Sequence, residues 1–233
     1  MHRITRFTLG MISGLMIITP SLSAQISEEQ RQQDKKELLQ GYHQKPGVDT
    51  PFALPSITVQ DPEGNDVSLN ELFSESDFTV LKIVRGDWSI RCTNALSELG
   101  RAQDDLAAQG ARLIAISPER AKHATRQIAK AIGEENFSIE LYIDSSTQLI
   151  RKLRIAERLR EKVITQFEKS LQDRREYAFE EDHPNASGEW VTPLTATVIV
   201  DSAGTVVWMQ SSWNTREQAT PEDITAALEA LAE

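Results

Sequence analysis

Two mostly apolar runs, the first of them β-branched, separated by a helical stretch constrain the fold more than any other feature of this sequence. The runs are 79–84 (TVLKIV) and 112–117 (RLIAIS), and between them leucines recur at helical spacing until Gly110 ends the pattern. Nearly continuous runs of this kind are typical of strands buried on both faces, and a helix between two strands makes them parallel. The sequence therefore predicts a β-α-β unit at the centre of an α/β domain.

Shorter patterns flank this unit. Residues 56–60 and 67–69, joined by a turn that contains Pro, Gly and Asn, predict a hairpin before it. After it we expect a helix over 119–132, a strand over 139–143 and a charged helix over 146–181. The helix over 146–181 interrupts the alternation of strands and helices that builds a parallel sheet, so we interpret it as a helical insertion.

The C-terminal part of the sequence predicts a hairpin and a closing helix. The runs 195–200 and 205–209 are joined by Asp-Ser-Ala-Gly, which suits a tight turn. Thr220 followed by Pro221 and two acidic residues is a helix start. The predicted fold class is α/β, with a central mixed β-sheet flanked by helices and the helical insertion before the C-terminal hairpin.

The first 24 residues have the pattern of a secretory signal peptide. Arg3 and Arg6 precede an apolar core of roughly ten residues, too short for a bilayer that needs about twenty, and Pro20 precedes a small-residue site ending at Ala24. We expect cleavage after Ala24 and an exported protein, periplasmic or secreted. An uncleaved membrane anchor is the alternative.

The remaining chain divides into a charged leader or linker, 25–48, and one domain, 49–233. The leader has few apolar residues and can bury little. The whole chain carries 25 Lys and Arg against 35 Asp and Glu, and no basic patch offsets this balance, so a nucleic-acid partner is not expected. The histidines are far apart and without ligand spacing, so we predict no metal and no cofactor.

Cys92 is the only cysteine of the chain, which excludes internal disulfides and multi-cysteine metal sites. In an exported protein a lone cysteine is either buried and inert or kept for its reactivity. Cys92 falls where the helix after strand 79–84 begins, and the helix dipole with Arg91 or Arg85 nearby would stabilise a thiolate there. Ser89 is either the N-cap that bonds the Cys92 amide or a donor to a substrate oxygen.

The segment VLKIVRGDWSIRCTNALSELGRAQDDLAAQGARLIAISPE resembles the peroxiredoxin-like branch of the alkyl hydroperoxide reductase and thiol-specific antioxidant family. That family's Arg-Gly, Trp, second cysteine and Ile-Ser-Pro all have counterparts here. Further on, TPLTATVIVDSAGTVVW and SWNTREQATPEDITAALEAL resemble its hairpin and closing segment, so the similarity covers about Phe52 to Leu231. The resemblance implies a thioredoxin-like fold.

The resemblance also implies a chemistry, with two departures from the family pattern. Ser89 replaces the first cysteine, which disfavours a dithiol reductase, whereas Ser89-x-x-Cys92 resembles the Thr/Ser-x-x-Cys of peroxiredoxins, in which one thiolate attacks a peroxide. Arg85 stands where that pattern has a proline, and Thr195 where either a second arginine or the thioredoxin-type proline is expected. The Arg85 guanidinium would stabilise a thiolate and a developing peroxide charge, or else form a surface ion pair with Asp87.

The resulting site prediction has catalytic and pocket residues. We expect Cys92, Ser89 and Arg85 to carry the reaction, and the substrate-pocket candidates are Trp88, Arg91, Thr195 and Trp213. Tryptophans are commonly core or rim residues, so a pocket role for Trp88 and Trp213 competes with that interpretation.

Two functions from different classes fit this sequence. One is a thiol-dependent peroxidase in which a hydroperoxide oxidises Cys92 to sulfenic acid and an external thiol or thioredoxin-like reductant restores it. The other is a degenerate thioredoxin-fold protein without catalysis, an exported binding or structural module. A homodimer is compatible with both.

Overall fold

The computed structural model describes residues 46–133, 137–158, 191–214 and 216–232. All of them belong to one compact unit, Gln44–Glu233. The predicted signal peptide and nearly all of the predicted leader lie outside the described residues. Among the helices that the structure describes, none has the length and apolar content needed to cross a membrane.

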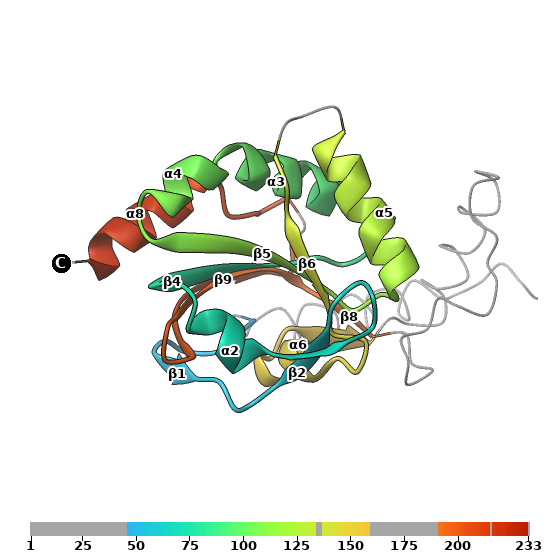
Figure 1. Ribbon diagram of the computed structural model, residues 1–233, viewed down its shortest axis with the longest axis horizontal. Coiled ribbons are helices and arrows are strands. Elements are labelled where there is room, and N and C mark those ends of the chain that lie inside the picture. Colours follow the sequence, from blue (N-terminus) through green and yellow to red (C-terminus); the bar gives the residue numbers. More distant parts are fainter. Residues whose placement is uncertain (1–45, 134–136, 159–190, 215, 233) are drawn as a thin grey trace, which may run out of the picture. The chain divides into compact units, whose positions relative to one another are not determined.

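Eight strands form one mixed sheet in the order β1-β10-β9-β4-β5-β6-β2-β3 (Figure 1). Their bounds are β1 Phe52–Ala53, β2 Thr58–Gln60, β3 Asp66–Ser68, β4 Phe78–Ile83, β5 Ala111–Ser117, β6 Glu140–Ile143, β9 Thr195–Asp201 and β10 Thr205–Ser212.

The centre of the sheet is the parallel pair that the sequence predicts. β4 and β5 run side by side from Phe78 opposite Ala111 to Ile83 opposite Ile116. β6 continues the parallel part, while β9 lies antiparallel to β4 on its other side and pairs with β10 as the predicted hairpin. β2 and β3 form the expected N-terminal hairpin. The predicted architecture is confirmed.

Helices cover both faces of this sheet (Figure 1). On one face lie α3, α4, α5 and α8, and on the other lie α2 and α6. The helix bounds are α2 Leu69–Phe73, α3 Ile90–Arg101, α4 Gln103–Ala107, α5 Ala121–Ile132, α6 Gln148–Lys152 and α8 Pro221–Leu231. The start of α8 is as predicted: Thr220 caps it in a reciprocal capping box with Asp223.

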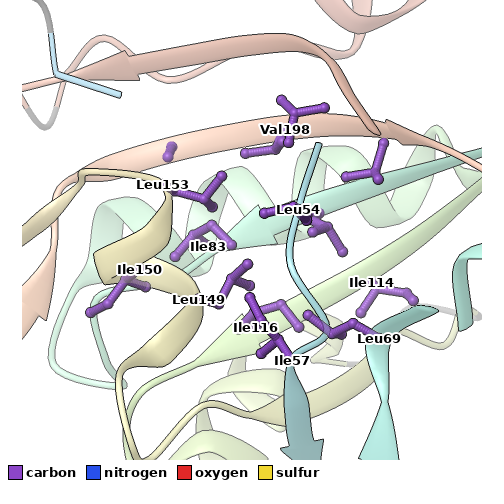
Figure 2. Packing of buried hydrophobic residues seen from close by; sticks show 14 of the residues in the cluster. Leu54, Ile57, Leu69, Ile83, Ile114, Ile116, Leu149, Ile150, Leu153 and Val198 are labelled. Atoms are coloured by element: carbon purple, nitrogen blue, oxygen red, sulfur yellow. The ribbon is translucent and has the colours of Figure 1, made fainter. Parts of the chain in front are cut away.

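Alternation along the central strands divides the core between the two faces. Leu81 and Ile83 of β4 point to the face of α2 and α6, where they pack with residues such as Ile116, Leu149 and Val198 (Figure 2). Val80 and Val84 point to the opposite face and pack under α3, α5 and α8. Both faces of β4 are therefore buried, as its β-branched composition predicts.

The predicted helix over 146–181 is only partly observed, and its observed part is shorter than predicted. α6 ends at Lys152, Arg154 takes a positive φ of 56°, and Ala156–Arg158 form strand β7 instead of helix. β7 pairs antiparallel with β8, Val191–Pro193, in a separate two-stranded sheet. Glu157 is held opposite Thr192 across this ribbon, which overrides the local helical pattern. The remainder of the predicted helix lies outside the described residues.

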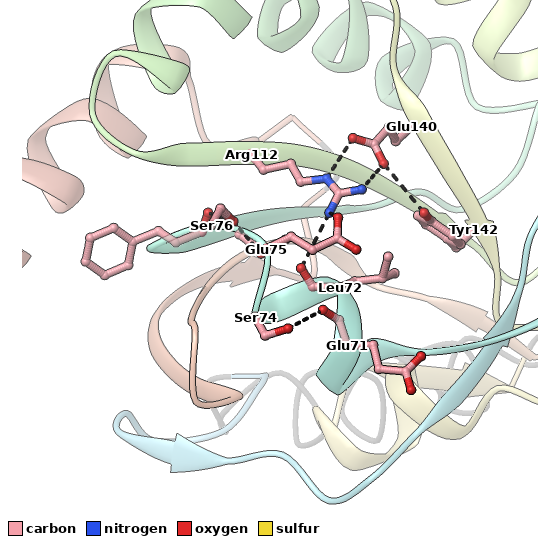
Figure 3. Close-up of polar contacts among 10 residues, drawn as sticks. Glu71, Leu72, Ser74, Glu75, Ser76, Arg112, Glu140 and Tyr142 are labelled. Carbon is pink, nitrogen blue, oxygen red and sulfur yellow. Dashed lines mark hydrogen bonds and ion pairs between the residues drawn. The ribbon is translucent and has the colours of Figure 1, made fainter.

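Arg112 ties together three elements at the amino end of the central strands (Figure 3). Its Nε donates to Glu140 Oε1 at 2.7 Å and its Nη2 to the other oxygen of the same carboxylate. Nη1 donates to Glu75 and, at 3.5 Å, to the carbonyl of Leu72 in α2. The two carboxylates raise the pKa of the Arg112 guanidinium above its ordinary value. β5, β6 and the end of α2 are thus joined through one side chain.

Candidate functional site

The candidate site begins where β4 ends and α3 starts. Ser89 is the N-cap of α3, and its hydroxyl accepts a hydrogen bond from the Cys92 amide at 3.5 Å. Its carbonyl accepts the amide of Thr93 at 3.1 Å. The N-cap role that the sequence allowed for Ser89 is confirmed, and its role toward a substrate oxygen stays a prediction. Cys92 thus occupies the third position of the helix, where backbone N–H groups favour an anion.

The Cys92 thiol is free and faces the sheet. Only 1% of the residue is exposed, and it packs against Val84, Leu96, Ala115 and Ala124. The sulfur is therefore closed off from solvent in this structure. Burial raises the electrostatic effect of every nearby charge, because little water screens it.

Arg85 follows β4, and its guanidinium contacts one aromatic ring and one carboxylate. Its guanidinium lies over the Trp88 ring, 5.1 Å from the ring centroid, and its Nη2 is 3.7 Å from Glu157 Oε2 in β7. The side chain is 15% exposed, and its buried Nε has no hydrogen-bond partner among the described residues. The Arg85–Asp87 ion pair considered from the sequence is wrong, because Glu157, distant in sequence, takes that place.

Gly86 allows the chain to turn tightly between Arg85 and the helix. Its φ is +144°, and a Cβ there would lie 2.4 Å from Trp88 Nε1 and 2.5 Å from Glu119 Oε1. Any side chain at this position would push apart the tryptophan and the carboxylate. The Arg-Gly pair of the sequence is therefore explained by geometry.

A buried acidic cluster beside the helix start was missed by the sequence reasoning. The Asp87 carboxylate, fully buried, accepts from Arg126 Nε, and the Asp87 amide donates to Glu119 Oε2 at 2.7 Å. Burial, reinforced by the nearby Asp87 charge, raises the pKa of Glu119 to about 8. Arg126 Nη2 also lies 2.8 Å from His123 Nδ1.

A signal for this cluster was present in the sequence. Asp87 and Glu119 each follow one of the two central strands, and loops at the carboxyl ends of adjacent parallel strands meet in space. The charged residues of α5 that complete the cluster have no such signal, because their direction depends on how the helix packs.

The pocket candidates separate into two groups. Trp88 stacks under Arg85, and Thr195 begins β9 beside the carboxyl end of β4, where Ala196 pairs with Ile83. Thr195 is 2% exposed, and its buried Oγ1 has no hydrogen-bond partner within the described part of the chain. By contrast, Arg91 is exposed, and Trp213 packs against the core cluster of the opposite face. The structure brings Trp88 and Thr195 to the site, and it does not bring Arg91 into the core or Trp213 to Cys92.

The arrangement suits chemistry at one sulfur. A helix start stabilises a thiolate, and Arg85 and Thr195 hold buried polar atoms that have no partner in the described residues. Oxygen atoms that gain negative charge during a reaction are stabilised by such donors. In the described ranges, no three His, Cys, Asp or Glu side chains are grouped so that they could hold a metal ion.

The AhpC/TSA family model matches residues 52–209, which include the whole segment from Arg85 to Cys92. No curated protein sequence matches the chain significantly.

Solved structures of peroxiredoxins are similar to this chain in fold. Peroxidoxin BcpB from Mycobacterium tuberculosis is 18% identical over 82% of this chain and 97% of its own, with a TM-score of 0.52. A mutant of peroxiredoxin 6 from Arenicola marina is 14% identical over 80% of this chain and 74% of its own, with a TM-score of 0.59. A yeast mitochondrial 1-Cys peroxiredoxin is 12% identical over 79% of this chain and 76% of its own, with a TM-score of 0.54. These similarities identify the fold as the thioredoxin-like one that the sequence resemblance implied.

Proposed function

The chain belongs to the AhpC/TSA family, and from this premise we propose that it is a thiol-dependent peroxidase whose single reactive group is the Cys92 thiolate. The observation that carries the proposal is the position of Cys92. It lies third in α3, with its amide bonded to the Ser89 hydroxyl and with Arg85 following the adjoining strand. A thiolate at that position is stabilised by the helix start.

The oxidative step is a displacement at a peroxide oxygen. The Cys92 sulfur attacks the terminal oxygen of a hydroperoxide, an S–O bond forms and the O–O bond breaks. The leaving alkoxide takes up a proton, so the products are an alcohol, or water, and a Cys92 sulfenic acid. In this step the Nε of Arg85, buried and without a partner in the described residues, donates to the oxygen that gains charge.

The reductive step needs sulfur from outside the chain, since Cys92 has no internal partner. One external thiol condenses with the sulfenic acid, which releases water and leaves a mixed disulfide. A second thiol attacks that disulfide, which frees the Cys92 thiol and releases the oxidised reductant. The yeast 1-Cys peroxiredoxin of similar fold is described as resolved through glutathione and thioredoxin systems. Its example supports a small thiol or a thioredoxin-like protein as the reductant here.

Intact-mass measurement after exposure to peroxide tests the proposal. Wild-type protein should gain one oxygen at Cys92 and, with a sulfenic-acid trap, one trap adduct at the same residue. Cys92→Ser should gain neither, and peptide mapping separates any methionine oxidation. The same two proteins are then assayed for turnover with hydrogen peroxide, an alkyl hydroperoxide and an excess of thiol.

The burial of Cys92 favours the second candidate, a thioredoxin-fold module without catalysis. The two functions give different rates. A peroxidase oxidises Cys92 much faster than peroxide oxidises free cysteine at the same pH. A rate equal to or below that of free cysteine would remove the peroxidase proposal and leave the module.

We also propose export of the mature chain from Gln25. Removal of residues 1–24 leaves 23 Lys and Arg against 35 Asp and Glu, an acidic protein. N-terminal sequencing of the exported protein should start at Gln25, and an intact Met1 in a membrane fraction would contradict the proposal. Analytical ultracentrifugation of the same sample distinguishes a monomer from a homodimer.

A further inference from the structure

A lysine lies in the middle of the central strand, where the sequence pattern predicts apolar packing. Lys82 of β4 is completely buried. It points to the same face as Val80 and Val84, its second neighbours along the strand. Val80 packs in the cluster that contains Leu99, and Val84 in the cluster that contains Cys92. Lys82 therefore lies beneath α3, between the part of the helix that carries Leu99 and the part that carries Cys92.

Two hydrogen bonds hold the Lys82 ammonium without neutralising its charge. Its Nζ donates to Thr197 Oγ1 at 3.2 Å, across the register pair of β4 and β9, and to Gln218 Oε1 at 2.6 Å. Both acceptors are neutral. The register neighbour on β5 is Ala115, which carries no charge either. A buried ammonium without a charged partner is costly, so the nearest anion gains importance.

Two ionisable side chains of α3, Cys92 and Glu98, favour the charged form of Lys82. Burial lowers the pKa of Lys82 to about 8, and the negative charges of Cys92 and then Glu98 oppose that decrease. Glu98 is exposed to solvent, which screens its charge, whereas Cys92 is 1% exposed. Of the two, Cys92 is the one that shares the buried environment of the ammonium.

We propose that Lys82 is the buried counter-charge of the Cys92 thiolate, a positioning residue that sets how much of the thiol is ionised without touching the substrate. A role for this pair in catalysis rests on the proposed function. The electrostatic pairing of Lys82 with Cys92 does not, because it can be measured without peroxide. The segment that ends in the Cys92 helix then carries two cations: Lys82 in the core beneath α3, and Arg85 after β4.

The pairing has a consequence for the oxidised protein. A sulfenic acid is neutral, so oxidation of Cys92 removes the buried negative charge that faces Lys82. The ammonium is then less stable, and the pKa of Lys82 falls when Cys92 is oxidised or replaced by a neutral residue. This reciprocity follows from linkage: whatever Lys82 does to the ionisation of Cys92, Cys92 does to the ionisation of Lys82.

The test is the pH dependence of Cys92 alkylation by iodoacetamide in wild type and in Lys82→Met. Methionine is close to lysine in length and suits an apolar core, so the variant should fold. The rate–pH curve of Lys82→Met should move to higher pH by about one unit, and its rate at neutral pH should fall roughly tenfold, because a nearby opposite charge shifts ionisation by about that much. The two proteins should react equally at pH values where both thiols are fully ionised.

Two further variants complete the experiment. Lys152→Met removes an exposed lysine of α6, on the other face of the sheet, and should leave the curve unchanged. Lys82→Arg keeps the charge and should restore part of the shift. A Lys82→Met curve that superposes on wild type, in a protein with a normal thermal unfolding transition, would overturn the proposal.

A reciprocal measurement does not require any core variant of Lys82 to fold. Carbon-13 NMR of labelled lysine follows the titration of Lys82 in wild type and in Cys92→Ser. The titration midpoint should be lower in Cys92→Ser, and equal midpoints would contradict the pairing. Since neither readout uses peroxide, a protein with a shifted alkylation curve but no peroxidase turnover would remove the proposed function and retain the charge pair.

Discussion

Arg85 and Arg112 lie at opposite ends of the central parallel strands and use their guanidinium groups in opposite ways. All three nitrogens of Arg112 donate, to two carboxylates and a carbonyl (Figure 3). Arg85 has one ion pair, at 3.7 Å, and a buried Nε with no hydrogen-bond partner in the described residues. Every guanidinium nitrogen of Arg112 therefore has an acceptor, whereas the Nε of Arg85 has none among the described residues.

The difference separates a structural arginine from one available for a ligand. A buried donor without an acceptor costs free energy, and a folded protein rarely keeps one without a reason. Four of the five N–H groups of Arg112 have acceptors, and these acceptors lie in β6, in α2 and in the turn that follows α2. The Nε of Arg85, close in sequence to the start of the Cys92 helix, has no acceptor among the described residues. Substitutions at the two ends should therefore affect different properties, rate at one and stability at the other.

The largest effect is expected for Arg85→Met. Loss of a donor to the charged oxygen of the transition state should slow oxidation of Cys92 by peroxide about 100-fold. Because a single ion pair at this distance contributes little, the free energy of unfolding should change by less than about 1 kcal/mol. Stopped-flow measurement of sulfenic-acid formation gives the oxidation rate, and urea denaturation gives the free energy of unfolding. Equal oxidation rates in variant and wild type would show that Arg85, like Arg112, has a structural role only.

Glu119 should make the free energy of unfolding depend on pH. Its pKa is about 8 in the folded protein and 4.5 as a model group, so between these values the folded state holds more protons than the unfolded state. Its contribution is present below pH 4.5 and is lost as pH rises through 8. The melting temperature should fall by several degrees over this range, and Glu119→Gln should reduce that fall.

Other groups set the limits of the Glu119 experiment. Burial also raises the pKa of Asp144, to about 6, so part of the fall below pH 6 should survive in Glu119→Gln. Lys82 acts in the opposite direction above pH 8, where its lowered pKa favours folding as pH rises. An identical pH profile in Glu119→Gln and wild type would show that Glu119 is not the titrating group.

Arg112→Met should be the counterpart of Arg85→Met. Removal of the guanidinium leaves Glu140 and Glu75 without their shared partner, and we expect a loss of about 2 kcal/mol in the free energy of unfolding. The rate at which peroxide oxidises Cys92 should stay as in wild type. A variant that loses reactivity while it keeps its stability would reverse the distinction between the two ends.

The smallest effect is expected for the helix cap. Ser89→Ala should lower the free energy of unfolding by about 1 kcal/mol, because the Cys92 amide loses its acceptor. It should also slow oxidation of Cys92 without abolishing it. Thr220→Ala is the matched control, since it removes the N-cap of α8 and should cost similar stability with no change in the reaction. Equal rates in both variants would reduce Ser89 to a cap alone.

Local composition was sufficient to predict most of the sheet. The runs 79–84 and 112–117 are nearly continuous and mostly apolar, which predicted their burial and parallel pairing, and the Asp-Ser-Ala-Gly turn predicted the C-terminal hairpin. The predicted helix over 146–181 fails at Ala156–Arg158, because pairing with β8 decides the conformation there and β8 lies far away in the sequence. Tertiary contacts override local propensity at such places.

The candidate site was predictable only as far as it is local. Ser89 and Cys92 belong to one helix start, so their hydrogen bond follows from spacing. The partner of Arg85 is Glu157, in a different sheet, and no local pattern connects them. Lys82 sits in a run that otherwise reads as apolar, and only its buried hydrogen bonds show that the strand carries a charge beneath the helix.

The β7–β8 ribbon holds Arg85 from both of its strands. Glu157 of β7 pairs with the Arg85 guanidinium, and Thr192 of β8, which lies opposite Glu157, donates its hydroxyl to the Arg85 carbonyl at 3.4 Å. One cross-strand pair therefore contacts both the side chain and the backbone of the arginine. A substitution that weakens the pairing of this small sheet should shift Arg85 without altering any residue of the α3 helix start.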